Sequence, residues 1–231
     1  MPQLIAMIII VVGAMIYMFQ TFGGTGDKIE GIAQKTSVIT EINNIKTGLQ
    51  FASRDGKIAD KYDTATTPQY FNTLIGLARD GYFAEAINGQ IKNDDTGAAR
   101  TVNTFNQYSA ISFGGNATNS ADGKGSMLIS LISNQAGAIP GIFVDLSRGS
   151  LADNKDFLEA QIAKDFEAIA HVDRLASVAT AGATFSSGAL RTTGTEAMKR
   201  VPVAATGGKE DDGMFAIYFY DFGTSQLVQD K

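Results

Sequence analysis

The sequence predicts an α+β fold, in which a long N-terminal α-helix packs on a globular head that contains an antiparallel β-sheet. Three observations predict this arrangement. The first 26 of the 231 residues carry no charged side chain. A helical repeat of apolar residues follows them, to about residue 53. The C-terminal half then holds apolar runs of strand length, of which the last reads MFAIYFYDF. We therefore expect two parts, residues 1–26 and residues 27–231, and the second of these is called the head.

The first part contains an apolar segment, residues 4–22, with the sequence LIAMIIIVVGAMIYMFQTF. A helix of this length spans roughly 28 Å, which is about the thickness of the hydrocarbon core of a bilayer. The net charge of the chain is −5, and all of its charged residues follow residue 26. Such a segment must be shielded from water, either by lipid or by other copies of itself.

No Lys or Arg precedes the apolar segment. A secretory signal peptide has a basic region ahead of its apolar core, and a membrane anchor carries positive charge on its cytoplasmic side. We therefore expect that a short basic leader has been removed ahead of Met1.

A glycine break separates the apolar segment from the amphipathic half of the predicted helix. Gly23, Gly24 and Gly26 each weaken a helix by roughly 1 kcal/mol relative to alanine. From Asp27 to about Ser53 the 3.6-residue period resumes, with most charged residues, including Glu41 and Lys46, displaced from the apolar side. We expect this half to pack on the head through the stripe Ile32, Ile42, Ile45 and Leu49.

Local patterns place further elements in the head. Thr67 and Pro68 predict the start of a helix that ends near Gly81. A second helix is expected over residues 153–174. Strands are expected over residues 108–113, 127–133, 141–146 and 214–222, with the last as a central strand of the sheet.

Composition excludes several kinds of chemistry. The chain has no cysteine, so disulfides, thiol catalysis and cysteine-ligated metals are absent. His171 is its single histidine, and we expect it near the end of the second helix, without a catalytic role. The acidic turn over residues 209–213 and the pair Asp94 and Asp95 could bind Ca²⁺, although solvated turns explain them better. We expect no enzyme activity, no cofactor, no metal site and no nucleic-acid surface.

Residues 1–53 resemble the N-terminal half of type IV pilins, particularly the longer type IVb pilins. The shared features are the uncharged segment, the glycine break and the amphipathic continuation. The resemblance implies a prepilin peptidase that removes the leader, with methylation, and a pilus assembly machinery. It also implies residence in the inner membrane before assembly, followed by an extracellular filament at the cell surface. Two features depart from the family: Ile5 stands where a glutamate is usual, and the C-terminal cysteine pair is missing.

As a pilin, the chain would form a helical homopolymer in which apolar segments bundle at the centre. Small residues such as Ala6 and Gly13 allow close approach of helices, and large aliphatic residues fill the space between them. The expected filament-core residues are Leu4, Ile5, Ala6, Ile8, Ile9, Ile10, Val11, Val12, Gly13, Ala14, Ile16 and Phe19. The alternative is a membrane-anchored periplasmic or cell-surface binding domain with a permanent N-terminal transmembrane helix.

The glycine break generates a first prediction. Replacing Gly23, Gly24 and Gly26 with alanine should stiffen this region, because each replacement removes backbone freedom. We expect fewer or less extensible filaments, measured by electron microscopy and by stretching single filaments. Filaments of unchanged number and extensibility would contradict this role.

Overall fold

The computed structural model describes residues 30–63, 69–94, 97, 99–116, 125–177, 189–204 and 208–231. The apolar segment, the predicted filament-core residues and the glycine break at Gly23, Gly24 and Gly26 all lie outside the described residues. The predicted boundary at residue 26 does so as well. Within the described ranges, no helix is both long enough and apolar enough to cross a bilayer.

The centre of the head is a five-stranded sheet in which every neighbouring pair is antiparallel. Its strand order is β1-β2-β3-β5-β4. The strands are β1 (Tyr108–Ser109), β2 (Leu128–Ile132), β3 (Gly141–Asp145), β4 (Ala170–Asp173) and β5 (Met214–Phe219). This sheet and the helices beside it confirm the predicted α+β class.

Three apolar runs of the head form strands, as predicted, and they are the three inner strands of the sheet. Runs 127–133, 141–146 and 214–222 contain β2, β3 and β5. In β5, Ile217 lies opposite Ile142 of β3 and Val172 of β4, so β5 is flanked on both sides. Its residues from Phe215 to Phe219 are all buried, because strand neighbours cover its edges and packed side chains cover its faces.

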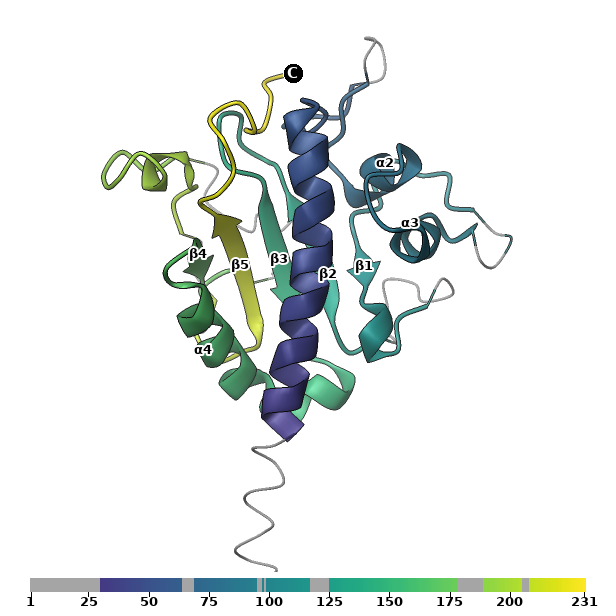
Figure 1. Ribbon diagram of the computed structural model, residues 1–231, viewed down its shortest axis with the longest axis vertical. Helices are drawn as coiled ribbons and strands as arrows, with labels where there is room; N and C mark the ends of the chain where they lie inside the picture. Colours follow the sequence, from purple (N-terminus) through teal and green to yellow (C-terminus); the bar gives the residue numbers. More distant parts are fainter. Residues whose placement is uncertain are drawn as a thin grey trace, which may run out of the picture.

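A helix over residues 30–54 crosses in front of the sheet (Figure 1). Its predicted contact stripe is confirmed for Ile42, Ile45 and Leu49, which are fully buried together with Val38. The prediction for Ile32 is wrong, because its side chain is 55% exposed.

Helix geometry explains the position of Ile32. The residue two turns before Val38 on the same side of the helix is Gly31. Gly31 is buried, and an added Cβ there would lie 3.0 Å from the ring of Phe157. At this end of the helix, the ring of Phe157 therefore occupies the place that Ile32 was expected to fill.

The remaining helices lie on either side of the 30–54 helix (Figure 1). On one side are α2 (Leu74–Arg79) and α3 (Glu85–Lys92), and on the other is α4 (Lys155–Phe166). Short 3₁₀ helices cover Ile111–Phe113, Gly149–Asn154 and Met198–Arg200.

Three predicted elements differ from the structure. Helix α2 begins at Leu74, where the side chain of Asn106 accepts a hydrogen bond from the Leu74 N–H at 3.1 Å, and Thr67 and Pro68 lie outside the described residues. The strand expected over residues 108–113 ends at Ser109 and continues as a 3₁₀ helix. The helix expected over residues 153–174 ends at Phe166, and residues 170–173 pair with β5 instead.

Helix α3 was not predicted, because Asn88 and Gly89 within it favour a turn. The side chain of Asn88 stabilises its first turn. Asn88 Oδ1 accepts a hydrogen bond from the Phe83 N–H, and Asn88 Nδ2 donates one to the Phe83 carbonyl oxygen. This contact is local, but residue types alone do not distinguish it from an ordinary asparagine turn.

The second prediction concerns Gly48 in the 30–54 helix. An added Cβ at Gly48 would lie 2.3 Å from the ring of Phe83 and 2.8 Å from the carbonyl oxygen of Tyr82. We expect Gly48→Ala to lower the free energy of unfolding by about 1–3 kcal/mol, despite the higher helix propensity of alanine. Thermal or urea unfolding of the detergent-solubilised full chain measures this change.

Gly31→Ala is the matched control, because it adds the same methyl group to the same helix. It meets only the ring of Phe157, which is itself 40% exposed and can shift. We expect a change between zero and a gain of about 1 kcal/mol. Equal losses in both variants would contradict the packing role of Gly48.

Candidate interaction surface

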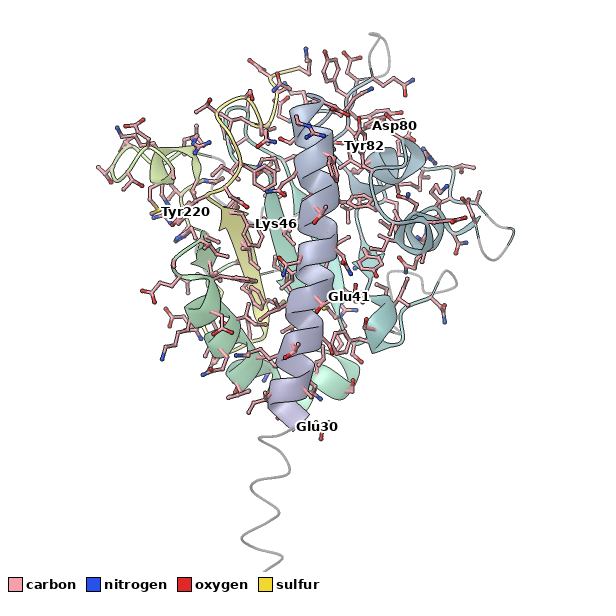
Figure 2. All side chains as sticks on the ribbon, viewed as in Figure 1. Glu30, Glu41, Lys46, Asp80, Tyr82 and Tyr220 are labelled. Atoms are coloured by element: carbon pink, nitrogen blue, oxygen red, sulfur yellow. The ribbon has the colours of Figure 1, made fainter. Side chains whose placement is uncertain are left out.

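The lysines of the 30–54 helix are drawn to one flank. Lys35 Nζ lies 2.8 Å from Asp165 Oδ2, and Lys46 Nζ lies 2.6 Å from Asp221 Oδ2. Lys46 also lies 4.3 Å from the ring centroid of Phe219, a cation–π distance. Figure 2 shows Lys46 on the β5 side of the helix. Both lysines therefore form ion pairs with acidic residues of the head.

Glu41 occupies the opposite flank, toward β1 (Figure 2). It was expected to lie away from the packed side, but it is only 3% exposed. Its carboxylate accepts a hydrogen bond from Tyr108 Oη and another from the Ser112 N–H, each at 3.0 Å. A buried carboxylate needs such donors, and here they connect the helix to β1 and the segment that follows it.

From Ile32 to Phe51, the side of the helix turned away from the sheet consequently carries no charged side chain, and Arg54 follows at its C-terminal end. We call this uncharged side the outer face. Its residues are exposed and lie within about a third of the helix circumference. They are Ile32, Ala33, Thr36, Thr40, Asn43, Asn44, Thr47 and Phe51. A water-exposed helix face ordinarily carries charged side chains, so a face without any is typical of a surface that contacts another molecule.

The threonines of the outer face use their hydroxyl hydrogens within the helix. Thr36, Thr40 and Thr47 each donate to the carbonyl oxygen four residues earlier, at 3.2, 2.9 and 2.9 Å. This pattern leaves the methyl groups free to contact a partner. The outer face is therefore less polar than its residue types indicate.

A hollow of about 430 Å³ lies beside the C-terminal half of the outer face. Gly48 makes the hollow possible, because its missing side chain lets the 81–84 segment approach the helix. Its lining contains no charged side chain. The lining residues are Asn44, Thr47, Gly48 and Phe51 from the helix, together with Gly81, Tyr82, Phe83, Ala84 and Ile87.

Tyr82 is one of the lining residues, and it lies near the C-terminal end of the 30–54 helix (Figure 2). Its hydroxyl donates a hydrogen bond to Asp55 Oδ2 at 3.1 Å. Burial, together with the neighbouring carboxylate of Asp55, raises the pKa of Tyr82 to about 12. The phenol is therefore neutral at physiological pH, and the hollow keeps its uncharged lining.

His171 does not lie at a helix end, contrary to the prediction. It is in β4, opposite Tyr218 of β5. Its Nε2 atom lies 2.7 Å from Nη2 of Arg191. Burial and the positive charge of Arg191 lower the pKa of His171, so the neutral imidazole accepts a hydrogen bond from the guanidinium. This contact attaches the 189–204 segment to the sheet.

The acidic turn over residues 209–213 is occupied by internal contacts. The guanidinium of Arg174 forms an ion pair with the Glu210 carboxylate and donates a hydrogen bond to the Glu210 carbonyl oxygen. Asp212 Oδ1 accepts a hydrogen bond from the Met214 N–H at 2.9 Å. Asp94 pairs with Lys92 at 2.8 Å, and Asp95 lies outside the described residues. Among the residues that the structure describes, no three His, Asp or Glu side chains are placed to hold a metal ion.

Beneath this turn lies Glu159 of α4, which is fully buried. Its carboxylate accepts hydrogen bonds from Arg174 Nε and from the Gly213 N–H, each at 2.8 Å. Burial raises its pKa from 4.5 to about 7, although the Gly213 N–H and Arg174 oppose the shift. This group is part of the fold, because it connects α4, β4 and the turn before β5.

Sequence patterns located the buried stripe of the 30–54 helix but not its outer face. The signal was present, because positions 32, 33, 36, 40, 43, 44, 47 and 51 carry no charge. These positions form an uncharged exposed surface only because Glu41 of the same helix is buried. The sequence pattern did not predict that burial. The hollow had no sequence signal, since α3 was not predicted.

Comparison with protein-family models, with curated proteins and with solved structures found no match to this chain.

The third prediction uses the raised pKa of Glu159. The folded state binds a proton at this carboxyl up to about pH 7, whereas the unfolded chain releases it near pH 4.5. The contribution of Glu159 to stability is therefore fully present below pH 4.5 and decreases as the pH rises toward 7. We expect wild-type stability to fall relative to Glu159→Gln by about 1–3 kcal/mol between pH 5 and pH 8.

Urea unfolding of the full chain in detergent at several pH values measures this difference. Glu167→Gln is the control, because Glu167 lies just after the same helix and is exposed. Its pH profile should follow the wild type. A Glu159→Gln profile parallel to the wild type would contradict the assignment.

Proposed function

We propose that this chain is the structural subunit, or major pilin, of an extracellular type IV pilus-like filament, assembled by bundling of apolar N-terminal helices. One observation carries the proposal. An uncharged N-terminal segment, long enough to span a bilayer, leads within a few residues into a helix that is packed on the head over most of its length.

The attachment of the helix supports a structural role. Val38, Ile42, Ile45 and Leu49 are all fully buried, so the helix belongs to the core of the head. A membrane anchor needs only a tether, and a flexible linker serves that purpose. A helix built into the head instead fixes the direction of the chain at residue 30, where the described part of the helix starts. When such subunits bundle their apolar segments, each head takes an equivalent position relative to the next head in the filament.

Burial supplies the driving force of such an assembly. Removal of apolar surface from water contributes about 25 cal/mol per Å², and it has no preferred direction. Small residues of the apolar segment, such as Ala6, Gly13 and Ala14, allow close contact between helices. A head-to-tail contact that does not close into a ring extends into a helical filament. Because Ile5 replaces the usual glutamate, the register of these helices would depend on packing alone.

The resemblance to type IV pilins supplies the rest of the proposal. Before assembly, the apolar segment resides in the inner membrane, where a prepilin peptidase removes the leader. The assembly machinery then transfers subunits into the filament at the cell surface. The main partner of the chain is itself. The described residues contain no metal-ligand cluster, and the proposal invokes no catalytic step.

Electron microscopy of material sheared from the cell surface tests this function. We expect filaments that contain the chain and that disappear in Ile9→Lys, because a lysine inside the bundle buries a charge without a partner. Ile9→Leu is the matched control and should retain filaments, because the side-chain volume is nearly conserved. Detergent-dependent monomers in the membrane fraction, without filaments, would instead establish the membrane-anchored binding domain.

A further inference from the structure

We infer that the outer face and the hollow beside it are the docking surface of the head for a second copy of this chain. The inference rests on the proposed function and adds a specific contact to it. The apolar segments hold the centre of the filament together, and this surface of the head receives a neighbouring subunit.

The arrangement of charge supports a protein-contacting surface. Within the 30–54 helix, Lys35 and Lys46 are paired on one flank and Glu41 is buried on the other. Arg54 lies beyond the C-terminal end of the outer face, where its guanidinium sits 5.0 Å from the ring centroid of Phe51. The exposed surface between Ile32 and Thr47 can consequently be covered without burying an unpaired charge, which would be costly.

The threonine hydroxyls of the surface raise little obstacle to burial. The hydroxyls of Thr36, Thr40 and Thr47 already donate to helix carbonyls, so covering them leaves no donor without a partner. Phe51 is 46% exposed at the edge of the hollow, which is unusual for an aromatic side chain facing water. Aromatic side chains beside a well-shaped pocket are typical of the centre of protein interfaces.

The hollow gives this surface a shape that can select a partner. With about 430 Å³ of space and an uncharged lining that includes Phe51, Phe83 and Ile87, it can admit a large apolar side chain. The chain carries such side chains, 40–57% exposed, on other parts of its surface. Outside the 189–204 segment, they are Val102, Ile111, Phe157 and Ile169. A projection on one copy that fits a pocket elsewhere on the next copy makes a contact that extends without closing.

Position along the chain identifies the occupant as a second copy. The outer face begins at Ile32, ten residues after the apolar segment ends at Phe22. Bundling of the apolar segments brings neighbouring subunits together at this end of the head. The outer face continues from this end along the 30–54 helix to the hollow, so a neighbour held by the bundle can lie along it.

Cysteine labelling of the full-length chain tests the inference. Because the chain has no cysteine, one introduced thiol is the only reactive one. Thr47→Cys places it in the lining of the hollow, and Thr193→Cys places it at another exposed threonine, in the 189–204 segment beyond the opposite edge of the sheet (Figure 1). Each variant is treated with maleimide as detergent-solubilised monomer and as assembled filament.

We expect Thr47→Cys to react at least about tenfold more slowly in filaments than in monomers, because a docked neighbour excludes the reagent and water. Thr193→Cys should react at similar rates in both. Equal reactivity of Thr47→Cys in filaments and monomers would overturn the inference while leaving the filament itself intact. Slow reaction in the monomer as well would show that the same chain covers this face, and that result also overturns the inference.

A charge placed in the hollow provides a second measurement. Thr47→Glu should reduce filament yield at least about tenfold, because docking would bury an unpaired carboxylate. The melting temperature of the solubilised monomer should stay close to the wild type, since position 47 is exposed. Thr193→Glu should assemble normally. Normal assembly of Thr47→Glu would overturn the inference, and the absence of filaments in the wild type would overturn it together with the proposed function.

Discussion

The packing of the 30–54 helix on the sheet is the interaction on which the rest of the structure depends. Val38, Ile42, Ile45 and Leu49 are buried completely, and each contributes roughly 1.5–3 kcal/mol by leaving water. This apolar contact decides that the helix belongs to the head, but it has little directional preference. Hydrogen bonds and ion pairs on the two flanks then select the rotation of the helix about its axis.

Those flanking contacts have a consequence for the exposed surface. Glu41 accepts hydrogen bonds from Tyr108 and Ser112 on one side, whereas Lys46 pairs with Asp221 on the other. Each contact removes a charged group from the solvent-facing side of the helix. The uncharged outer face thus results from interactions that stabilise the fold, and it is available as a contact surface.

Two glycines in the same helix contact aromatic rings, and at Gly48 this packing outweighs the low helix propensity of glycine. Gly31 and Gly48 each weaken the helix by roughly 1 kcal/mol relative to alanine. In return, Gly31 admits the ring of Phe157 and Gly48 admits the ring of Phe83. The contact at Gly48 brings the 81–84 segment against the helix and shapes the hollow. At both positions, the absence of a side chain lowers helix stability and allows close contact with an aromatic ring.

The sequence by itself determined the elements whose signals are local. β2, β3 and β5 were predicted because each is a continuous apolar run, and Ile42, Ile45 and Leu49 were predicted from the helical repeat. Only the tertiary structure decided the exposure of Ile32, the burial of Glu41, the extent of α3 and the place of His171 in β4. Three of these depend on a partner distant in sequence, namely Phe157 at Gly31, Tyr108 at Glu41, and β5 beside β4, whereas α3 uses the local contact between Asn88 and Phe83. A periodic pattern shows which side of an element avoids water, whereas the partner that covers that side is chosen when the whole chain folds.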